Sequence, residues 1–283
     1  MSAERSQGYE VVQFPWLRVP VVDSLRAARG KPMMHALVEV DVTRARELLS
    51  EHKRRTGETR SFTAFIIACT ARAVSEHRDM QAYRQGRRHL IFFDDVDVCM
   101  NIEHEGRQTG KQATPHVVRG ANRKTLREIH RDIRAAQTAG IGGVWAMRGR
   151  RLYPHLPRLL RAAFWWAFNR FPRLKQRIGG TLLLTSVGMF GRGAAWGITP
   201  VSDYTLTIVV GGIGERPALV DGQLDARQVL CLTVSADHNV VDGAPMARFV
   251  QRLVDLIESG YGLDEAGGDG AGTAVGTLSG TTT

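Results

Sequence analysis

Residues Leu230 to Glu258, LCLTVSADHNVVDGAPMARFVQRLVDLIE, decide the fold because a strand and a helix meet there around one histidine. Apolar and polar residues alternate up to Asp237, which is typical of a strand with one buried face. His238 follows this strand, and Asp242 and Gly243 then open a segment whose apolar residues recur at three- and four-residue spacing. This segment predicts an amphipathic helix with Asp242 as its N-cap. The stretch therefore displays a histidine at a strand end, where reactive groups are often exposed.

A resemblance to a known family rests on this stretch and on a second one upstream. His238, Asp242 and Gly243, in the order HNVVDG, resemble the HxxxDG motif of the catalytic domain of dihydrolipoamide acyltransferases, the core subunits of 2-oxoacid dehydrogenase complexes. The block TLLLTSVGMFGRGAAWGITP, from Thr181 to Pro200, is also similar to that family. A looser form of the motif occurs in chloramphenicol acetyltransferase. The resemblance extends over Arg18 to Ser259 and is most specific at its end.

The resemblance implies a fold and a domain organisation. It implies an α+β fold, a chloramphenicol acetyltransferase-like two-layer sandwich with a mixed sheet, assembled as a trimer. We expect no larger cage, because a Gly- and Thr-rich tail replaces the apolar C-terminal end of the family. We expect an N-terminal segment over residues 1–17, the catalytic domain over 18–260, and a disordered Gly- and Thr-rich tail over 261–283. No lipoyl or subunit-binding domain is recognisable before the catalytic portion, so we expect a free-standing catalytic domain.

The motif residues receive roles from the chemistry of acyl transfer between thiols. This reaction needs a base for the incoming thiol and a donor for the oxyanion that forms on the thioester carbonyl. His238 suits the first task, because an imidazole with an ordinary pKa of about 6.5 is largely neutral at pH 7. The resemblance implies that Asp242 orients the histidine loop by pairing with an arginine, for which Arg18 is the candidate. Gly243 is expected to allow the close turn into the helix and to lie at the bound coenzyme A.

The oxyanion donor is a choice between two neighbouring hydroxyl groups. Alignment with the family pattern places Thr185 where a Ser or Thr hydroxyl stabilises the transition state. Ser186 is the alternative and is also expected to contact coenzyme A. Because side chains alternate along a strand, only one of the two can face His238.

The remaining patterns predict a mixture of strands and helices. Strands are predicted over residues 38–42, 89–97, 98–102, 113–118, 204–211 and 228–236, and helices over 43–53, 61–74 and 123–137. Thr43 is the expected cap of the first of these helices. A hairpin turn is predicted at residues 220–223. The glycines at 211–214 are interpreted as a turn, because they lack the strand-turn-helix context of a nucleotide-binding loop.

Composition restricts the partners and the compartment. The 283 residues, 43% of them hydrophobic, can bury one sizeable core. The net charge of +10 raises the question of nucleic acid, but no helix-turn-helix, zinc-finger or RNA-recognition pattern supports it, and coenzyme A itself carries phosphates. Cys69, Cys99 and Cys231 lie in apolar runs without metal-ligand spacing, which argues against disulfides and a zinc site and for a cytoplasmic location. No signal-peptide pattern is present, and no apolar run reaches the roughly 20 residues of a membrane span.

The segment Val144 to Arg177 departs most from the family pattern. It contains three tryptophans and nine basic residues and no acidic residue. Its centre, LPRLLRAAFWWAFNRF, predicts an amphipathic helix with an apolar face opposite its arginines. Three interpretations stay open: a packed helix with a solvated basic rim, an element that admits an acyl chain or docks a carrier, and a helix on a membrane surface.

The function that these observations favour is CoA-dependent acyl transfer. We predict transfer of an acyl group between coenzyme A and a dihydrolipoyl-type thiol, carried on a separate protein, with His238 as base, Thr185 as oxyanion donor and no metal. Acyl transfer to a small-molecule hydroxyl or amine is one alternative. A second alternative is a non-catalytic scaffold that keeps the fold and binds partners through its Trp-rich segment.

Overall fold

The computed structural model describes residues 4–6, 8–15, 18–106, 110–138, 153–188, 193–220 and 222–264. Its centre is a six-stranded sheet with the order β3-β10-β9-β8-β6-β7. Neighbouring strands are antiparallel except that β8 runs parallel to both β6 and β9, so the sheet is mixed. The strands are β3 (Met33–Asp41), β6 (Val98–Gly106), β7 (Gly110–Val118), β8 (Leu182–Ser186), β9 (Leu206–Val220) and β10 (Gln223–Asp237).

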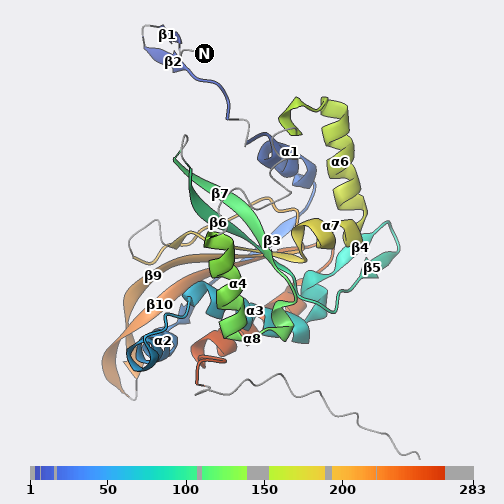
Figure 1. The fold of residues 1–283 in the computed structure, drawn as a ribbon. Helices are drawn as coiled ribbons and strands as arrows, with labels where there is room; N and C mark the ends of the chain where they lie inside the picture. Colours follow the sequence, from blue (N-terminus) through green and yellow to red (C-terminus); the bar gives the residue numbers. More distant parts are fainter. Residues whose placement is uncertain are drawn as a thin grey trace, which may run out of the picture.

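Four helices cover one face of this sheet (Figure 1). They are α2 (Thr43–Thr56), α3 (Phe62–Glu76), α4 (Leu126–Thr138) and α8 (Gly243–Glu258). Phe65 of α3 and Phe249 of α8 are fully buried and belong to one continuous hydrophobic cluster with Leu184 of β8 and Val234 of β10. The predicted two-layer α+β sandwich with a mixed sheet is therefore confirmed.

A second group of elements lies at one end of the sheet. Helix α1 (Arg18–Ala28) packs beside α6 (Arg158–Arg170), which leads into α7 (Pro172–Gly179), as Figure 1 shows. The short pair β4 (Tyr83–Gln85) and β5 (His89–Ile91) contacts this group through α7. The single turns η1 (Arg78–Gln81), η2 (Ala121–Arg123) and η3 (Tyr153–His155) connect these elements, and β1 (Glu4–Ser6) pairs with β2 (Tyr9–Val11). Helix α6 lies in the Trp-rich segment, whose residues 144–152 are outside the described residues.

Most predicted elements are present, but the strand predicted over residues 89–97 is wrong. Only His89–Ile91 is extended, and it pairs with β4 rather than with the main sheet. The side chain of Gln81 donates to the carbonyl of Phe93 at 2.9 Å, and that of Asn122 donates to the carbonyl of Asp94 at 3.0 Å. These side chains satisfy carbonyls that a strand would have offered to a neighbouring strand.

The predicted cap of α2 is also wrong. The Asp41 carboxylate, not the Thr43 hydroxyl, accepts a hydrogen bond at this helix start, from the Thr43 amide at 2.8 Å. The Thr43 hydroxyl instead accepts from the amide of Gln228 at 2.8 Å. The hydroxyl is thus used to hold β10 against the helix start. At α3 the Ser61 hydroxyl does accept from the amide of Ala64, at 3.4 Å.

The glycines at 211–214 lie inside β9 and not in a turn, which corrects the sequence interpretation. The pairing of β9 with β10 shifts at this point, so that Gly211 and Gly212 together face Cys231 in a β-bulge. Residues 193–195 cross directly over the bulge, and a Cβ on Gly212 would lie 2.1 Å from the Gly193 carbonyl oxygen. The glycines are required because another segment of backbone touches the strand. The hairpin turn predicted at 220–223 is confirmed, since Val220 pairs with Gln223.

The ordered domain continues past residue 260, where the expected tail was to begin. Leu263 is buried in the main hydrophobic cluster, and Asp264 forms an ion pair of 2.9 Å with Arg44 of α2. A disordered tail starting at residue 261 is therefore wrong for residues 261–264. Residues 265–283 lie outside the described part of the chain.

Candidate active site

His238 lies where the sequence predicted, immediately after the last residue of β10. Its amide donates to the carbonyl of Pro32 at 2.8 Å, which fixes the loop to the segment before β3. Its imidazole is 48% exposed, so a substrate can reach it. Asp237 braces the same loop, because the amide and the side-chain nitrogen of Asn239 both donate to its Oδ1 at 3.0 Å. The structure thus presents a reachable imidazole on a tightly bonded turn.

Asp242 contacts the histidine and does not cap the helix. Its carboxylate Oδ1 lies 3.7 Å from Nδ1 of His238, and its side chain is 86% exposed. It occupies the N-cap position of α8, but its side chain accepts no hydrogen bond from the helix, which corrects the predicted cap. A carboxylate on the Nδ1 side favours the proton on that nitrogen and leaves Nε2 free as an acceptor.

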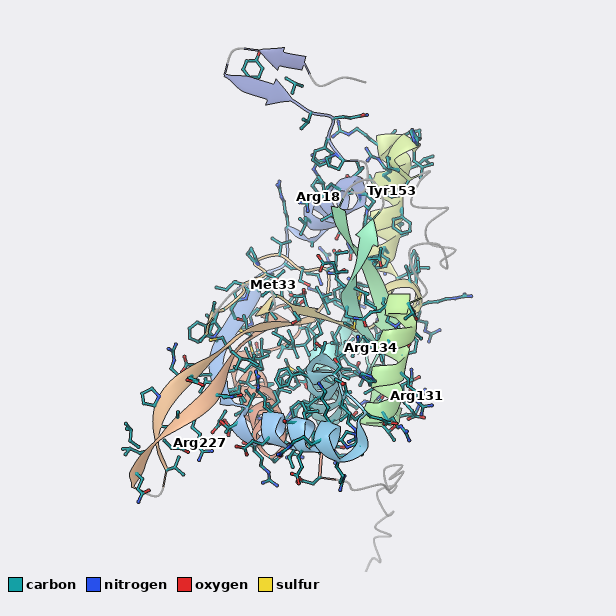
Figure 2. The ribbon with its side chains drawn as sticks, turned by 60° about the vertical axis from the view of Figure 1, so that its left-hand side comes forward. Arg18, Met33, Arg131, Arg134, Tyr153 and Arg227 are labelled. Carbon is teal, nitrogen blue, oxygen red and sulfur yellow. The ribbon has the colours of Figure 1, made fainter. Side chains whose placement is uncertain are left out.

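Arg18 and Gly243 do not have the geometry that the sequence suggested. Arg18 is the first residue of α1 and lies, with Tyr153, in the upper part of the molecule in Figure 2. In the described part of the chain, Asp242 has an ion-pair contact with His238 and none with Arg18. Gly243 is not among the glycines with positive φ in the described residues, and a Cβ there would meet no atom within 4 Å. A close turn is therefore not the reason for this glycine.

Thr185 and Ser186 point to opposite sides of β8. Ser186 has the same parity as Leu182 and Leu184, which are buried in the core beneath the helices. Thr185 therefore lies on the side of the sheet away from α2, α3, α4 and α8. Both residues are half-buried. The face of the sheet thus distinguishes two residues that the sequence could only rank.

A single chain does not bring Thr185 and His238 together. Thr185 aligns with Val209 of β9, which aligns with Thr233 of β10. Thr233 precedes His238 by five residues, so at roughly 3.3 Å per residue the two groups are offset by about 16 Å along the strand. Two strand spacings of about 4.8 Å separate them further. The two candidate residues are therefore not in contact within one chain.

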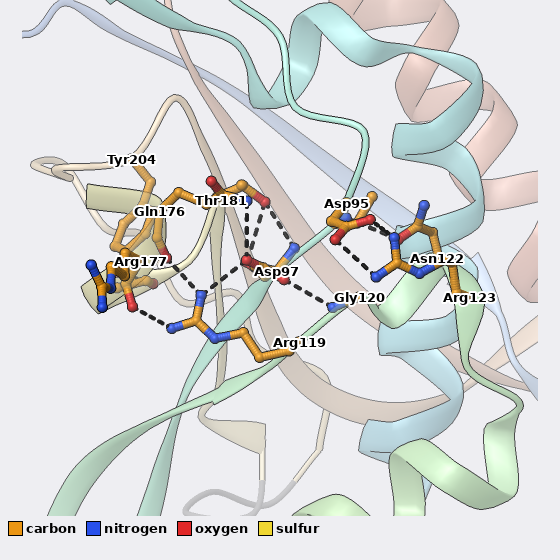
Figure 3. Close-up of polar contacts among 12 residues, drawn as sticks. Asp95, Asp97, Arg119, Gly120, Asn122, Arg123, Gln176, Arg177, Thr181 and Tyr204 are labelled. Atoms are coloured by element: carbon orange, nitrogen blue, oxygen red, sulfur yellow. Dashed lines mark hydrogen bonds and ion pairs between the residues drawn. The ribbon is translucent and has the colours of Figure 1, made fainter. Parts of the chain in front are cut away.

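A polar network holds the start of β8, which carries Thr185 (Figure 3). Asp97 donates its amide to the Thr181 hydroxyl at 3.0 Å and accepts the Thr181 amide on its carbonyl at 2.7 Å. Its buried carboxylate is paired with Arg119 at 2.9 Å. Arg119 also donates to the carbonyls of Gln176 and Arg177, at 2.6 and 2.7 Å, where α7 ends. The network therefore ties α7, β6 and β8 into one unit.

Two lysines near the histidine loop form a cluster that the sequence did not indicate. Lys31 lies 3.3 Å from the Asp237 carboxylate, and both Lys31 and Lys175 donate to the carbonyl of Asp203. Lys175 also donates to the side chain of Asn169 at 3.1 Å. Three aromatic rings surround the Lys175 ammonium group: Tyr83, Phe168 and Tyr204. Lys175 is one of the nine basic residues counted in the segment Val144 to Arg177, yet only 2% of it is exposed.

The burial of Lys175 changes its protonation. Removal from water is the main cause that lowers the pKa of its ammonium group to about 7, and the nearby charge of Lys31 adds to the effect.

Burial likewise raises the pKa of the Cys231 thiol. A thiol held in its protonated form on a core strand is a poor nucleophile. This supports the interpretation of Cys231 as a core residue.

A further histidine lies on the face of the sheet away from α2, α3, α4 and α8. Nδ1 of His35 and the hydroxyl of Ser235 are 2.8 Å apart, and the two residues are paired in the β3–β10 register. The hydroxyl of Thr233, on the same face, is buried without a hydrogen-bond partner among the described residues. A single histidine in a strand carried no sequence signal, so only the register reveals this polar row.

Neither a metal cluster nor a membrane-crossing helix occurs in the described part of the chain. Within those residues, no three His, Cys, Asp or Glu side chains are placed to hold a metal ion. Among the same residues, no helix combines the length and the apolar character needed to cross a membrane.

Curated proteins of known type are similar to this chain in sequence. The lipoamide acyltransferase component of the branched-chain alpha-keto acid dehydrogenase complex of Bacillus subtilis is 24% identical over 249 residues, which are 86% of this chain and 51% of that protein. The chain spans about half the length of the curated relatives it matches, or less.

Solved structures share the fold. A probable dihydrolipoamide acetyltransferase from Listeria monocytogenes superposes with a TM-score of 0.67 at 20% identity, covering 93% of this chain and 99% of that one. The dihydrolipoamide acetyltransferase of Azotobacter vinelandii, solved to investigate the catalytic roles of a serine, a histidine and an asparagine, gives 0.65 at 18% identity, covering 91% and 96%.

A family model decides the relationship. The model described as 2-oxoacid dehydrogenases acyltransferase (catalytic domain) matches residues 6–144 and 170–263. The unmatched residues, 145–169, contain nearly all of α6 and fall within the segment that departs from the family pattern. His238, Asp242 and Thr185 all lie in the matched part. The chain therefore belongs to the family of 2-oxoacid dehydrogenase acyltransferase catalytic domains.

Proposed function

We propose that this chain transfers an acyl group between coenzyme A and a dihydrolipoyl-type thiol, with His238 as general base and Thr185 as oxyanion donor. One observation carries the proposal: in a chain of this family, a half-exposed His238 stands at the end of β10 with its Nδ1 facing the Asp242 carboxylate. In the Azotobacter relative, the histidine and the asparagine studied for catalysis are four positions apart, as His238 and Asp242 are here.

The proposed reaction uses one proton transfer in each direction. Nε2 of His238 takes the proton from the incoming thiol, and the thiolate attacks the carbonyl carbon of the thioester. The carbonyl electron pair moves to oxygen, where the Thr185 hydroxyl donates a hydrogen bond to the oxyanion. When the tetrahedral intermediate collapses, the other sulfur leaves as thiolate and takes the proton back from the imidazolium. No net proton is gained or lost, and a thioester and a thiol stand on both sides of the reaction, so the same residues serve both directions.

Asp242 supports the base without accepting its proton. Its carboxylate stabilises the imidazolium that forms during the reaction and favours the tautomer with the proton on Nδ1. Lys31 and Asp237 hold the loop that carries the histidine. Gly243 and Ser186 stay our proposed contacts for coenzyme A, and the open space around Gly243 supports the first of these.

The separation of Thr185 and His238 implies a site shared between subunits. Because the two lie far apart in one chain, the hydroxyl must come from a neighbouring copy if both act on one substrate. We propose a trimer in which each site takes His238 from one subunit and Thr185 from the next. A cyclic assembly of this kind closes with identical contacts at every interface.

The test is thiol release from acetyl-, propionyl- and longer acyl-CoA, with dihydrolipoamide as acceptor. We expect turnover by the wild type, loss in His238→Ala, and no change in His89→Ala, since His89 is an exposed residue of β5 and is not part of the motif. Thiol release that needs an amine or hydroxyl acceptor instead would support the small-molecule alternative. Absence of turnover together with absence of CoA binding by calorimetry would favour the scaffold alternative.

A further inference from the structure

Helix α6 exposes apolar side chains on its outer face. Leu159 is 83% exposed, Trp166 64% and Leu160 56%. The helix also has a packed inner face, where Phe168 is buried and Trp165 donates its indole N–H to the hydroxyl of Tyr153 at 2.7 Å. The outer residues are therefore an additional apolar surface, beyond what the packing of α6 requires.

Arginines lie directly beside this apolar surface. A cavity of about 610 Å³ between α1 and α6 is lined by Arg26, Arg158, Arg161 and Arg170, together with Trp165 and Trp166. Its one carboxylate, Asp23, is already engaged, since it pairs with Arg161 at 3.1 Å and accepts a hydrogen bond from Tyr153 at 2.9 Å. Among the described residues, Arg158 and Arg170 have no carboxylate partner. The cavity is therefore a positively charged pocket.

We propose that α6 and this arginine-lined pocket bind the surface of an anionic phospholipid bilayer. Leu159, Leu160 and Trp166 enter the boundary between headgroups and acyl chains, and Arg158 and Arg170 contact lipid phosphates. A helix with Leu and Trp on one side and arginines at its edges is the pattern of helices that lie in this interface. The contact is peripheral, because α6 has only 13 residues.

Charge complementarity favours an anionic bilayer over a second copy of this chain and over an acidic protein. A two-fold contact, in which a second copy docks through this same surface, would place arginines against arginines, and residues 144–177 contain no acidic side chain to offset them. An acidic protein could match the arginines, but an apolar strip as exposed as Leu159 and Trp166 is better satisfied by a hydrocarbon boundary. Because the family model omits residues 145–169, the surface is a feature of this chain beyond the shared catalytic domain.

The proposal is tested by co-sedimentation with vesicles of phosphatidylcholine alone and of phosphatidylcholine with phosphatidylglycerol. We expect binding only to the anionic vesicles. The double variant Leu159→Ser, Trp166→Ser and the double variant Arg158→Gln, Arg170→Gln should each weaken binding by about tenfold or more. All four side chains are exposed or line the open pocket, so far-UV circular dichroism should be unchanged.

Matched controls separate this surface from the general charge of the protein. Arg131→Gln, Arg134→Gln removes two charges from α4, which lies far from Tyr153 in Figure 2. Leu224→Ser removes a leucine that is 78% exposed at the tip of the β9–β10 hairpin. Both controls should keep wild-type binding. Equal losses in the controls, no vesicle binding by the wild type, or retention only on an acidic protein matrix would overturn the proposal.

Discussion

Thr185 and Ser186 are neighbours in sequence, yet the sheet assigns them to different surroundings. Ser186 shares the side of β8 that faces the helices, while Thr185 lies on the opposite side with the polar row of β3 and β10. We expect Thr185→Val to lower kcat by about 10²–10³-fold, the loss typical of a missing oxyanion donor. Ser186→Ala should change kcat by less than about tenfold. Steady-state kinetics on both variants checks this, and the opposite ranking would reassign the donor.

Lys175 makes a prediction about pH and stability. Its pKa is about 7 in the folded protein and 10.5 ordinarily, so between these values the unfolded chain binds a proton that the folded chain does not. The contribution of Lys175 to the free energy of unfolding is therefore lowest below pH 7. It rises as the pH increases from about 7 to 10.5. Lys175→Met removes the effect.

Urea denaturation of the wild type and of Lys175→Met from pH 6 to 10 measures the contribution of Lys175 to the free energy of unfolding. We expect Lys175→Met to exceed the wild type in stability most at pH 6 to 7, and the gap to narrow by up to about 1.4 kcal/mol per pH unit above that. Comparing the two proteins cancels the titration of other groups. A gap that stays constant across the range would show that Lys175 is not neutral in the folded state.

At the scale of elements, Arg119 joins α7 to the central sheet. Its guanidinium pairs with buried Asp97 and binds two carbonyls at the end of α7, next to Gly180, whose φ is 84°. A Cβ at Gly180 would lie 2.6 Å from the Asp97 carbonyl oxygen, so the chain passes very close here. Arg119→Met should lower the free energy of unfolding by about 2–3 kcal/mol, because Asp97 keeps its charge without a cationic partner.

A nearby ion pair provides the control for Arg119. Arg123 pairs with Asp95, but its side chain is 65% exposed. Arg123→Met should cost less than about 1 kcal/mol, since pairs in contact with water contribute little. Urea midpoints of the two variants give the comparison. Equal effects would mean that the Arg119 network contributes no more than an ordinary surface pair.

At the scale of the whole molecule, the separation of His238 and Thr185 predicts complementation between inactive chains. Co-expression of His238→Ala and Thr185→Val chains with different tags should give mixed trimers. Some of their interfaces contain an intact His238 from one chain and an intact Thr185 from the other. Each mixed trimer then has one restored site out of three, so doubly tagged assemblies should show about one third of the wild-type turnover.

The measurement is the activity of doubly tagged assemblies against assemblies of each variant alone, with sedimentation to establish the number of subunits. Recovery of activity only in the mixed assemblies would support a shared site. Assemblies of the expected size that recover nothing, or a monomeric protein with wild-type turnover, would contradict both the shared site and the proposed trimer.

Local patterns determined much of this protein. The sequence predicted β10 from the alternation of apolar and polar residues up to Asp237, and α8 from the helical spacing after Asp242. It predicted α3 from the apolar run at Ser61 to Val74. Each pattern shows which side of one element is apolar. The position of His238 at a strand end followed from the same reasoning. The sequence motifs also indicated the family, and the match of the family model to residues 6–144 and 170–263 confirms it.

The tertiary structure alone decided the features that depend on contacts between distant segments. Lys175 is buried because α7 lies over β4 and the Asp203 carbonyl, and no neighbouring residue in sequence reveals this. Gly211 and Gly212 are strand residues because residues 193–195 cross them. The offset between Thr185 and His238 follows from strand order and register. Residue spacing along the chain predicts which side of a single helix or strand is apolar. The burial of a side chain, the register of paired strands and the distance between two residues are fixed only when the elements pack together.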